Sequence, residues 1–178
     1  MSGKVGFRMV IILNGPLGIG KSTLAEALAE SIDHCVLLDG DNLIAANPPP
    51  ANETEYLHST IELLVAHHRR WGYQHFVIDH IWRAPAALGD LSRRLLDIDA
   101  GSDVRCFLLT LPLEENLRRI ERRQRARALD EEQFELKTVA EERNVLYESA
   151  ATELGEPFDV SAAPAHLVAA LKHRIGLT

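Results

Sequence analysis

Short apolar runs alternate with longer amphipathic stretches along the whole chain. The runs lie at Met9–Asn14, Cys35–Asp39, Phe76–Asp79, Val104–Thr110 and, more weakly, Phe158–Val160. Because few polar residues interrupt them, they predict strands that are buried on both faces, as in parallel sheets covered by helices. The pattern therefore indicates an α/β fold with about five parallel strands and helices on both sides of the sheet.

The stretches between these runs carry helix signals. Leu24, Leu28 and Ile32 recur every four residues and predict one buried stripe on a first helix. Asn52 and Glu55 have the spacing of a capping box that opens the next helix. Later helices are expected to start at Pro85, at Leu113, after a cap at Asp130, and at Pro164. Strands and helices alternate to the end, so we expect a single domain over residues 1–178.

Composition narrows the possible partners and compartment. The 178 residues include 19 Lys and Arg against 26 Asp and Glu, which gives a formal net charge of −7, and 46% are hydrophobic. An acidic chain is a poor general binder of nucleic acids or anionic membranes, because proteins bind both through an excess of Lys and Arg. The chain has only two cysteines, and it shows no signal-peptide pattern and no long apolar segment. These features predict a cytoplasmic protein without a membrane partner. We expect it to be a monomer or homodimer.

A phosphate-binding motif follows the first predicted strand directly. The sequence Gly15-Pro16-Leu17-Gly18-Ile19-Gly20-Lys21-Ser22 fits the pattern at every fixed position, and Thr23 follows it. Glycines let backbone N–H groups curl around phosphate oxygens, and the N-terminus of the following helix adds its positive dipole end. Lys21 is expected to reach the β- and γ-phosphates, and the Ser22 hydroxyl to bind Mg²⁺. The motif predicts binding of a nucleoside triphosphate. We expect ATP and Mg²⁺ as the cofactors, and GTP stays open as the alternative to ATP.

Three aspartates stand at the predicted carboxyl ends of strands, where open parallel sheets bind ligands. Asp39 and Asp41 follow the second strand, and Asp79 ends the third. One carboxylate of the first pair can bind the metal ion while the other accepts the proton of an attacking hydroxyl. Asp79 is expected to hold water bound to the metal. The structural alternatives are an Asp-Gly turn with a helix cap at Asp41, and a polar strand end at Asp79.

A dense cluster of arginines follows the fourth predicted strand. Six arginines occur within ten residues, at positions 118, 119, 122, 123, 125 and 127. Helical spacing puts Arg119 and Arg123 on one face, so a lid over about 118–135 could neutralise charge on the triphosphate. The alternative is a solvated helix whose arginines pair with neighbouring glutamates.

The order of these features resembles the small P-loop kinases, which include shikimate kinase, gluconate kinase, adenylylsulfate kinase and chloramphenicol phosphotransferase. Asp39-Gly40-Asp41-Asn42 is similar to the gluconate and adenylylsulfate kinase pattern. The combination of Ile11–Gly15, Asp41–Ile44 and Val77–Asp79 looks more like chloramphenicol phosphotransferase. The resemblance implies the three-layer P-loop nucleoside-triphosphate hydrolase fold. It also implies that Asp41 is the general base, and that adenine lies against lid arginines such as Arg127 and the loop ending at Pro164.

The acceptor is expected to bind to the segment from about 42 to 72. No Lys or Arg occurs between Asn42 and Ala66, which disfavours an acceptor bearing phosphate or sulfate. Stacking surface for a neutral hydroxylated molecule, or simple core packing, is the expected role of Tyr56, Trp71 and Trp82. A carboxylated acceptor stays possible because of Arg69, Arg70 and Arg83.

The leading interpretation is a kinase that transfers the γ-phosphoryl group of ATP to a hydroxyl of a sugar, sugar acid or hydroxylated antibiotic. The expected catalytic residues are Lys21, Asp41, Arg119 and Arg123. The expected nucleotide-binding residues are 15–23, Arg127 and Pro164. The expected metal-binding residues are Ser22, Asp39 and Asp79. A nucleoside or nucleotide kinase, a non-enzymatic ATP-binding switch and a kinase of nucleic-acid 5′-hydroxyls stay open as alternatives.

Overall fold

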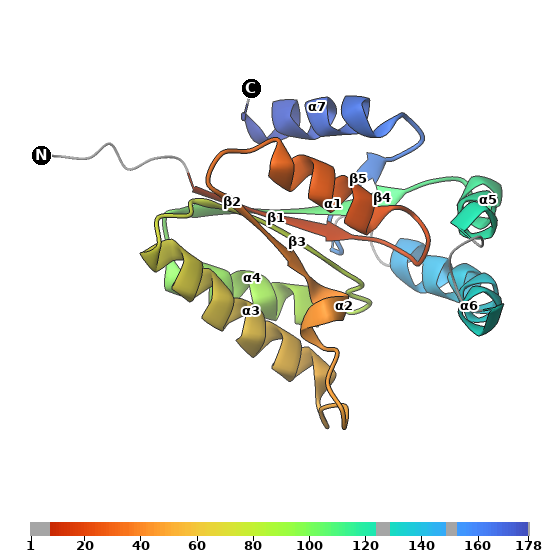
Figure 1. Cartoon of the computed structure of the whole chain (residues 1–178), viewed down its shortest axis with the longest axis horizontal. Helices are drawn as coiled ribbons and strands as arrows, with labels where there is room; N and C mark the ends of the chain where they lie inside the picture. The colour runs from red at the N-terminus through yellow and green to blue at the C-terminus, as the bar shows by residue number, and fades with distance from the viewer. Residues whose placement is uncertain (1–7, 124–128, 149–152, 178) are drawn as a thin grey trace, which may run out of the picture.

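A five-stranded parallel sheet forms the centre of the protein, for which a computed structural model describes residues 8–123, 129–148 and 153–177 (Figure 1). The strand order is β2-β3-β1-β4-β5, and every neighbouring pair is parallel. The strands are β1 (Arg8–Asn14), β2 (Cys35–Asp39), β3 (His75–His80), β4 (Ser102–Thr110) and β5 (Glu156–Asp159). The predicted fold class is therefore confirmed, and each strand overlaps a predicted apolar run.

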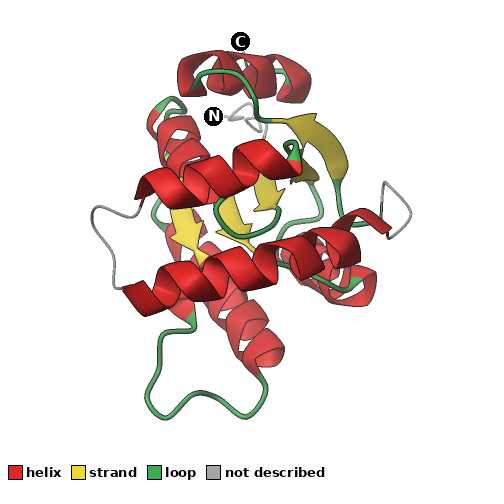
Figure 2. Ribbon diagram, turned by 90° about the vertical axis from the view of Figure 1, so that its right-hand side faces the viewer, coloured by secondary structure: helices red, strands yellow, loops and turns green. Residues whose placement is uncertain are grey.

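Helices cover both faces of this sheet (Figure 1). One face carries α1 (Lys21–Glu30) and α7 (Pro164–Ile175), and the other carries α3 (Glu53–Arg70) and α4 (Pro85–Ile98). The remaining helices are α2 (Gly40–Leu43), α5 (Leu113–Arg123) and α6 (Leu129–Glu148). Figure 2 looks onto the end of the sheet where α5 and α6 lie, and shows helices crossing in front of the strands. None of the helices in the described ranges is long and apolar enough to cross a bilayer.

The central strand β1 shows why its sequence is apolar throughout. Met9, Ile11 and Leu13 pack with the helices α1 and α7, whereas Val10 and Ile12 pack with α3 and α4. All five side chains are at most 1% exposed. A strand with two covered faces has no solvent side for polar residues, so the usual alternation of apolar and polar positions is lost.

The helix start predicted at Asn52 is confirmed, whereas the cap predicted at Asp130 needs correction. The side-chain oxygen of Asn52 accepts the Glu55 N–H at 3.1 Å, as a capping box requires, but the Glu55 carboxylate pairs with Arg94 of α4. Only one of the two hydrogen bonds of a capping box therefore forms, because Arg94 binds the carboxylate that would make the second. The helix α6 begins at Leu129, so Asp130 lies inside its first turn and is not its cap.

Candidate active site

The phosphate-binding loop, residues 15–20, joins the carboxyl end of β1 to the first turn of α1. Gly18 and Gly20 have φ angles of 69° and 101°, a region that side chains rarely adopt. A Cβ atom added to Gly18 would lie 2.2 Å from Cγ1 of Ile120 in α5. The loop therefore needs glycine at this position both for its turn and for the close packing of α5.

A buried amide holds the start of this loop. The side chain of Asn14, at the end of β1, is 0% exposed. Its nitrogen donates to the carbonyl oxygens of Trp82 and Leu154 at 3.0 and 3.2 Å, and its oxygen accepts the N–H groups of Gly15 and Trp82 at 2.8 and 3.0 Å. Three segments that are distant in sequence are thus joined at the root of the loop.

The two reactive side chains of the motif lie at the mouth of the loop. Nζ of Lys21 donates to the carbonyl oxygens of Gly15 and Pro16 at 2.9 and 3.1 Å, and the residue is 8% exposed. The hydroxyl of Ser22 donates to Oδ2 of Asp79 at 2.9 Å. The motif on β1–α1 and the aspartate of β3 therefore meet, as predicted from the edge of a parallel sheet.

The surroundings of Asp79 suit a hydrated magnesium ion. The residue is 3% exposed, and its Oδ1 atom has no hydrogen-bond partner among the residues that the structure describes. Burial raises the pKa of Asp79 to about 6, since a carboxylate loses hydration there. A buried carboxylate oxygen that lacks a donor, beside a serine hydroxyl, is a suitable partner for Mg²⁺ or for its bound water. The residues present thus fit the expected metal ion.

Asp39 caps a short helix that the sequence pattern did not predict. Its Oδ1 atom accepts the N–H groups of Asp41 and Asn42 at 2.9 and 3.2 Å, and its Oδ2 atom accepts the side-chain amide of Asn42 at 2.8 Å. The strand ends at Asp39, so Asp39 and Asp41 do not share a strand face. The cap expected at Asp41 is found two residues earlier, and the metal-binding role of Asp39 stays a prediction.

The helix α2 brings Asp41 to the end of β3. A Cβ atom added to Gly40 would lie 2.7 Å from Cβ of His80 and 2.9 Å from the carbonyl oxygen of Asp79, so only glycine allows this approach. Oδ1 of Asp41 is 2.8 Å from Nδ1 of His80. This hydrogen bond is the main reason that the pKa of Asp41 lies below its ordinary value.

His80 is a site residue whose role the sequence analysis did not identify. Its only signal in the sequence is its place directly after Asp79 at the end of a strand. Its ring also meets the ring of Trp82 edge to face, with centroids 5.2 Å apart. His80 is therefore fixed from two sides, by a carboxylate and by an indole.

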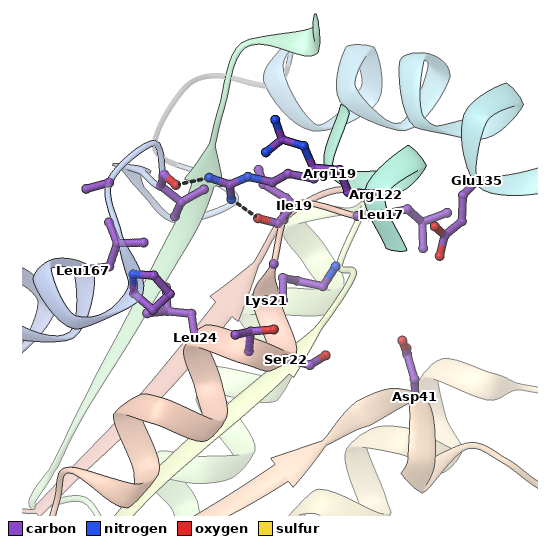
Figure 3. Close-up of a pocket in the computed structure, with 16 residues that line it drawn as sticks. Leu17, Ile19, Lys21, Ser22, Leu24, Asp41, Arg119, Arg122, Glu135 and Leu167 are labelled. Carbon is purple, nitrogen blue, oxygen red and sulfur yellow. Dashed lines mark hydrogen bonds between the residues drawn. The ribbon is translucent and has the colours of Figure 1, made fainter. Parts of the chain in front are cut away.

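Arg119 connects the phosphate-binding loop to the loop after β5 (Figure 3). Its guanidinium donates to the carbonyl oxygen of Ile19 at 2.9 Å and to that of Val160 at 2.7 Å. Arg122, one turn further along α5, lines the same cavity. Of the other predicted lid residues, the side chain of Arg123 and the whole of Arg127 lie outside the described residues. Among the residues that the structure describes, the arginines that line this cavity are therefore Arg119 and Arg122, three positions apart.

A cavity of about 380 Å³ opens above the phosphate-binding loop. Figure 3 shows Lys21, Ser22 and Asp41 on one side of it and Arg119 and Arg122 on another. The loop after β5 closes a further side. Its contribution comes from Val160, Ala162 and Pro164. Peptide N–H groups, cations and an apolar wall are the groups that a nucleoside triphosphate requires.

A second cavity, of about 460 Å³, lies beside the first. Part of its wall comes from α2, the start of α3 and the segment after β3, and the opposite part comes from α6. Leu17 and Asp41 line both cavities. The amide nitrogen of Leu17 donates to Glu142 of α6 at 3.1 Å, and its carbonyl oxygen accepts the side-chain amide of Asn116 at 3.0 Å. Asp41 therefore stands in the wall between two adjoining sites.

Some residues expected to touch the acceptor lie elsewhere. Arg69 donates to the hydroxyl of Ser102 at 2.6 Å and lies 3.4 Å from Asp99, at the opposite end of the sheet from the phosphate-binding loop, so its predicted role was wrong. The indole of Trp82 is 3% exposed and donates to Nε2 of His58 at 3.1 Å, which makes it a core residue.

The remaining residues that were expected near the acceptor lie partly at the surface and partly in the second cavity. Tyr56 and Trp71 are exposed, and neither lines the second cavity. Arg83 does line it. The wall contributed by α6 was missed entirely, because its place depends on tertiary packing that the helical pattern does not encode.

Solved structures with the same fold include small P-loop kinases, the group that the sequence resembles. The tunicamycin resistance protein of Deinococcus radiodurans is 20% identical, with a TM-score of 0.69 and coverage of 96% of this chain and 97% of that one. A gluconokinase from Sinorhizobium meliloti 1021 is 17% identical, with a TM-score of 0.63 and coverage of 96% and 97%. A shikimate kinase from Bacteroides thetaiotaomicron is 18% identical, with a TM-score of 0.61 and coverage of 95% and 99%.

The sequence comparisons give a family but no individual relative. No curated protein matches the chain. A family profile described as "AAA domain" matches residues 10–148, from the third residue of β1 to the end of α6. This range includes the phosphate-binding loop, Asp41, Asp79 and the arginines of α5. The chain therefore belongs to the AAA domain family and has the fold of the small P-loop kinases.

Proposed function

We propose that this protein transfers the γ-phosphoryl group of Mg²⁺-bound ATP to a hydroxyl group of a small molecule. The observation that carries the proposal is the position of Asp41, which lines both the cavity above the phosphate-binding loop and the cavity beside it. A carboxylate between a phosphoryl donor and a second site is suitably placed to accept the proton of an attacking hydroxyl.

In this proposal the first cavity holds ATP. The N–H groups of the loop and the N-terminus of α1 bind the phosphates, and Lys21 and Arg122 compensate their charge. The adenine ring of ATP lies against Arg119 and the apolar residues after β5, such as Pro164. When bound near Ser22 and Asp79, Mg²⁺ neutralises charge on the phosphates and fixes their orientation.

The acceptor occupies the second cavity, and its hydroxyl points at Asp41. The oxygen of this hydroxyl forms a bond to the γ-phosphorus while the bond from phosphorus to the β–γ bridging oxygen breaks. The proton passes to the carboxylate of Asp41, and ADP leaves with the electron pair of the broken bond. Because His80 keeps the pKa of Asp41 low, the carboxylate is ionised at neutral pH and accepts the proton late in the step.

The solved structures described above agree with this proposal. Two of them are named as kinases of small molecules, gluconokinase and shikimate kinase. Their identities to this chain are below 20%, so they support a reaction class and leave the acceptor of this protein to be found.

The test is formation of ADP from Mg-ATP in the presence of sugars, sugar acids, nucleosides and hydroxylated antibiotics. Stimulation by one class is expected in the wild type and should vanish in Lys21→Ala. Asp41→Asn should bind ATP nearly normally while turnover falls by about 10²–10⁴-fold, the range typical of a general base. Full turnover in Asp41→Asn would remove this residue from the role. Tight ATP binding without stimulation by any acceptor would instead favour a nucleotide-dependent switch.

A further inference from the structure

The charges around the second cavity indicate the kind of acceptor. We propose that the acceptor carries a protonated amine as well as the hydroxyl that is phosphorylated, as in an amino sugar or another amino alcohol. This inference rests on the proposed function, because it takes the second cavity as the acceptor site. It is carried by the residues of α6 and of the start of α3 that line this cavity.

One stripe of α6 faces the cavity. Phe134, Thr138, Glu141 and Val145 all line it. Their spacing of four, three and four residues puts them on a single side of a helix. The stripe combines a carboxylate with apolar groups, and Phe134 is 62% exposed. A helix face with this composition suits a ligand that has both an apolar surface and a positive charge.

Acidic groups outnumber basic groups around the cavity. Carboxylates come from Asp41, Glu53, Glu141 and Glu142, whereas Arg83 is the one guanidinium among the described residues that line it. The guanidinium of Arg83 is already paired with Glu142. The cavity therefore has no described arginine or lysine left to compensate an anionic acceptor.

The four carboxylates are not equivalent. Glu142 has Arg83 and the amide of Leu17 as partners, and Asp41 has His80. For Glu53 and Glu141, no hydrogen bond or ion pair of the carboxylate is found within residues 8–123, 129–148 and 153–177. These two carboxylates, from α3 and α6, are the ones free to bind an additional cation.

An ammonium group would satisfy these carboxylates, since hydrogen bonds between charged partners are roughly twice as strong as neutral ones. The exposed ring of Phe134 adds a face that attracts cations. A carboxylate or phosphate on the acceptor would instead meet like charge from Glu53 and Glu141. The same site should therefore accept an amino alcohol, tolerate its neutral analogue less well, and reject an acidic one.

The experiment compares matched acceptors that differ in charge. ADP formation is measured with glucosamine and with aminocyclitol antibiotics, alongside N-acetylated glucosamine and antibiotics, glucose and gluconate. The amines are expected to give a kcat/KM at least about tenfold above their N-acetylated forms, and gluconate to give the lowest value. Lys21→Ala is the blank for every acceptor.

Variants of the two carboxylates test the cause of this preference. Glu53→Gln and Glu141→Gln should each raise the KM for the amine by about tenfold, with the KM for ATP unchanged. The KM for an N-acetylated acceptor should not change. Glu30→Gln removes the same charge from an exposed position at the end of α1 and serves as the control.

The outcomes separate this inference from the proposed function. Failure of every amine to stimulate Lys21-dependent ADP formation, or an equal or better reaction with neutral or acidic analogues, overturns the amine preference. If neutral or acidic acceptors are phosphorylated in that case, the proposed kinase function stands. If no acceptor of any charge is phosphorylated, both proposals fail.

Discussion

Nδ1 of His80 lies 2.8 Å from Oδ1 of Asp41, and this contact joins the end of β3 to the first turn of α2. The two residues are 39 positions apart in the sequence. Their approach depends on Gly40, whose missing side chain leaves room for His80. The proposed base is therefore oriented by a neighbour on a rigid strand, although Asp41 itself is largely exposed.

His80→Ala should lower kcat by about tenfold, because one charge-assisted hydrogen bond no longer holds Asp41. The KM for ATP should stay unchanged, since His80 does not line the first cavity. His80→Asn restores a polar group at the same place and should recover part of the rate. Steady-state kinetics with His67→Ala, an exposed histidine of α3, provides the control. A loss of ATP affinity in place of turnover would contradict a positioning role.

Asp79→Asn should change stability in a direction opposite to its effect on activity. The pKa of Asp79 rises from 3.8 to about 6 on folding, so the ionised form destabilises the folded protein. The protonated carboxyl group of Asp79 contributes fully to the free energy of unfolding below pH 3.8. This contribution is lost as pH rises through about 6. The difference in free energy of unfolding between variant and wild type should therefore grow from about pH 4 to pH 7.

That difference should reach about 1–3 kcal/mol in favour of Asp79→Asn in metal-free buffer, given the size of the shift. Denaturant titrations at several pH values measure it. Mg²⁺-dependent ADP formation should fall in the same variant. A difference that is flat across pH 4 to 7 would show that the carboxylate is not destabilised by burial.

Gly40→Ala should destabilise the protein and reduce turnover, since the new methyl group would lie 2.9 Å from the carbonyl oxygen of Asp79. We expect a loss of about 1–3 kcal/mol, typical of overpacking. Gly89→Ala is a matched control, because a Cβ there meets nothing within 4 Å inside α4. That control should stabilise the helix by about 0.5–1 kcal/mol. Thermal unfolding of both variants distinguishes the two cases, and equal stability would argue against the close approach.

Arg119→Ala should raise the KM for ATP by about tenfold, because it removes the link between the phosphate-binding loop and the loop after β5. The kcat for saturating ATP should change less. Arg118→Ala is the control, since that side chain is 60% exposed and contacts Glu115 of its own helix. A fall in kcat at constant KM would instead show that Arg119 acts on the transferring phosphoryl group.

Local signals in the sequence were sufficient for the sheet and for the phosphate-binding loop. The continuous apolar runs reflect burial on two faces, and Gly18, Lys21 and Ser22 are required at fixed spacing within a few residues. These features depend on neighbours in the chain. They could therefore be predicted before any tertiary contact was known.

The remaining features of the site depend on distant contacts. Nothing in the pattern around Arg69 distinguishes an acceptor contact from its ion pair with Asp99. The helix α2 depends on the side chain of Asp39, which accepts the backbone N–H of Asp41 and so competes with continuation of the strand. The wall formed by α6 requires the packing of that helix beside Leu17, more than 100 residues earlier.

Asn14 has a consequence for the thermodynamics of nucleotide binding. Its amide makes four hydrogen bonds with Gly15, Trp82 and Leu154 without any ligand. The conformational entropy at the root of the loop is therefore already lost when the protein folds. Nucleotide binding does not have to bear that cost again, so a larger share of the interaction energy appears as affinity.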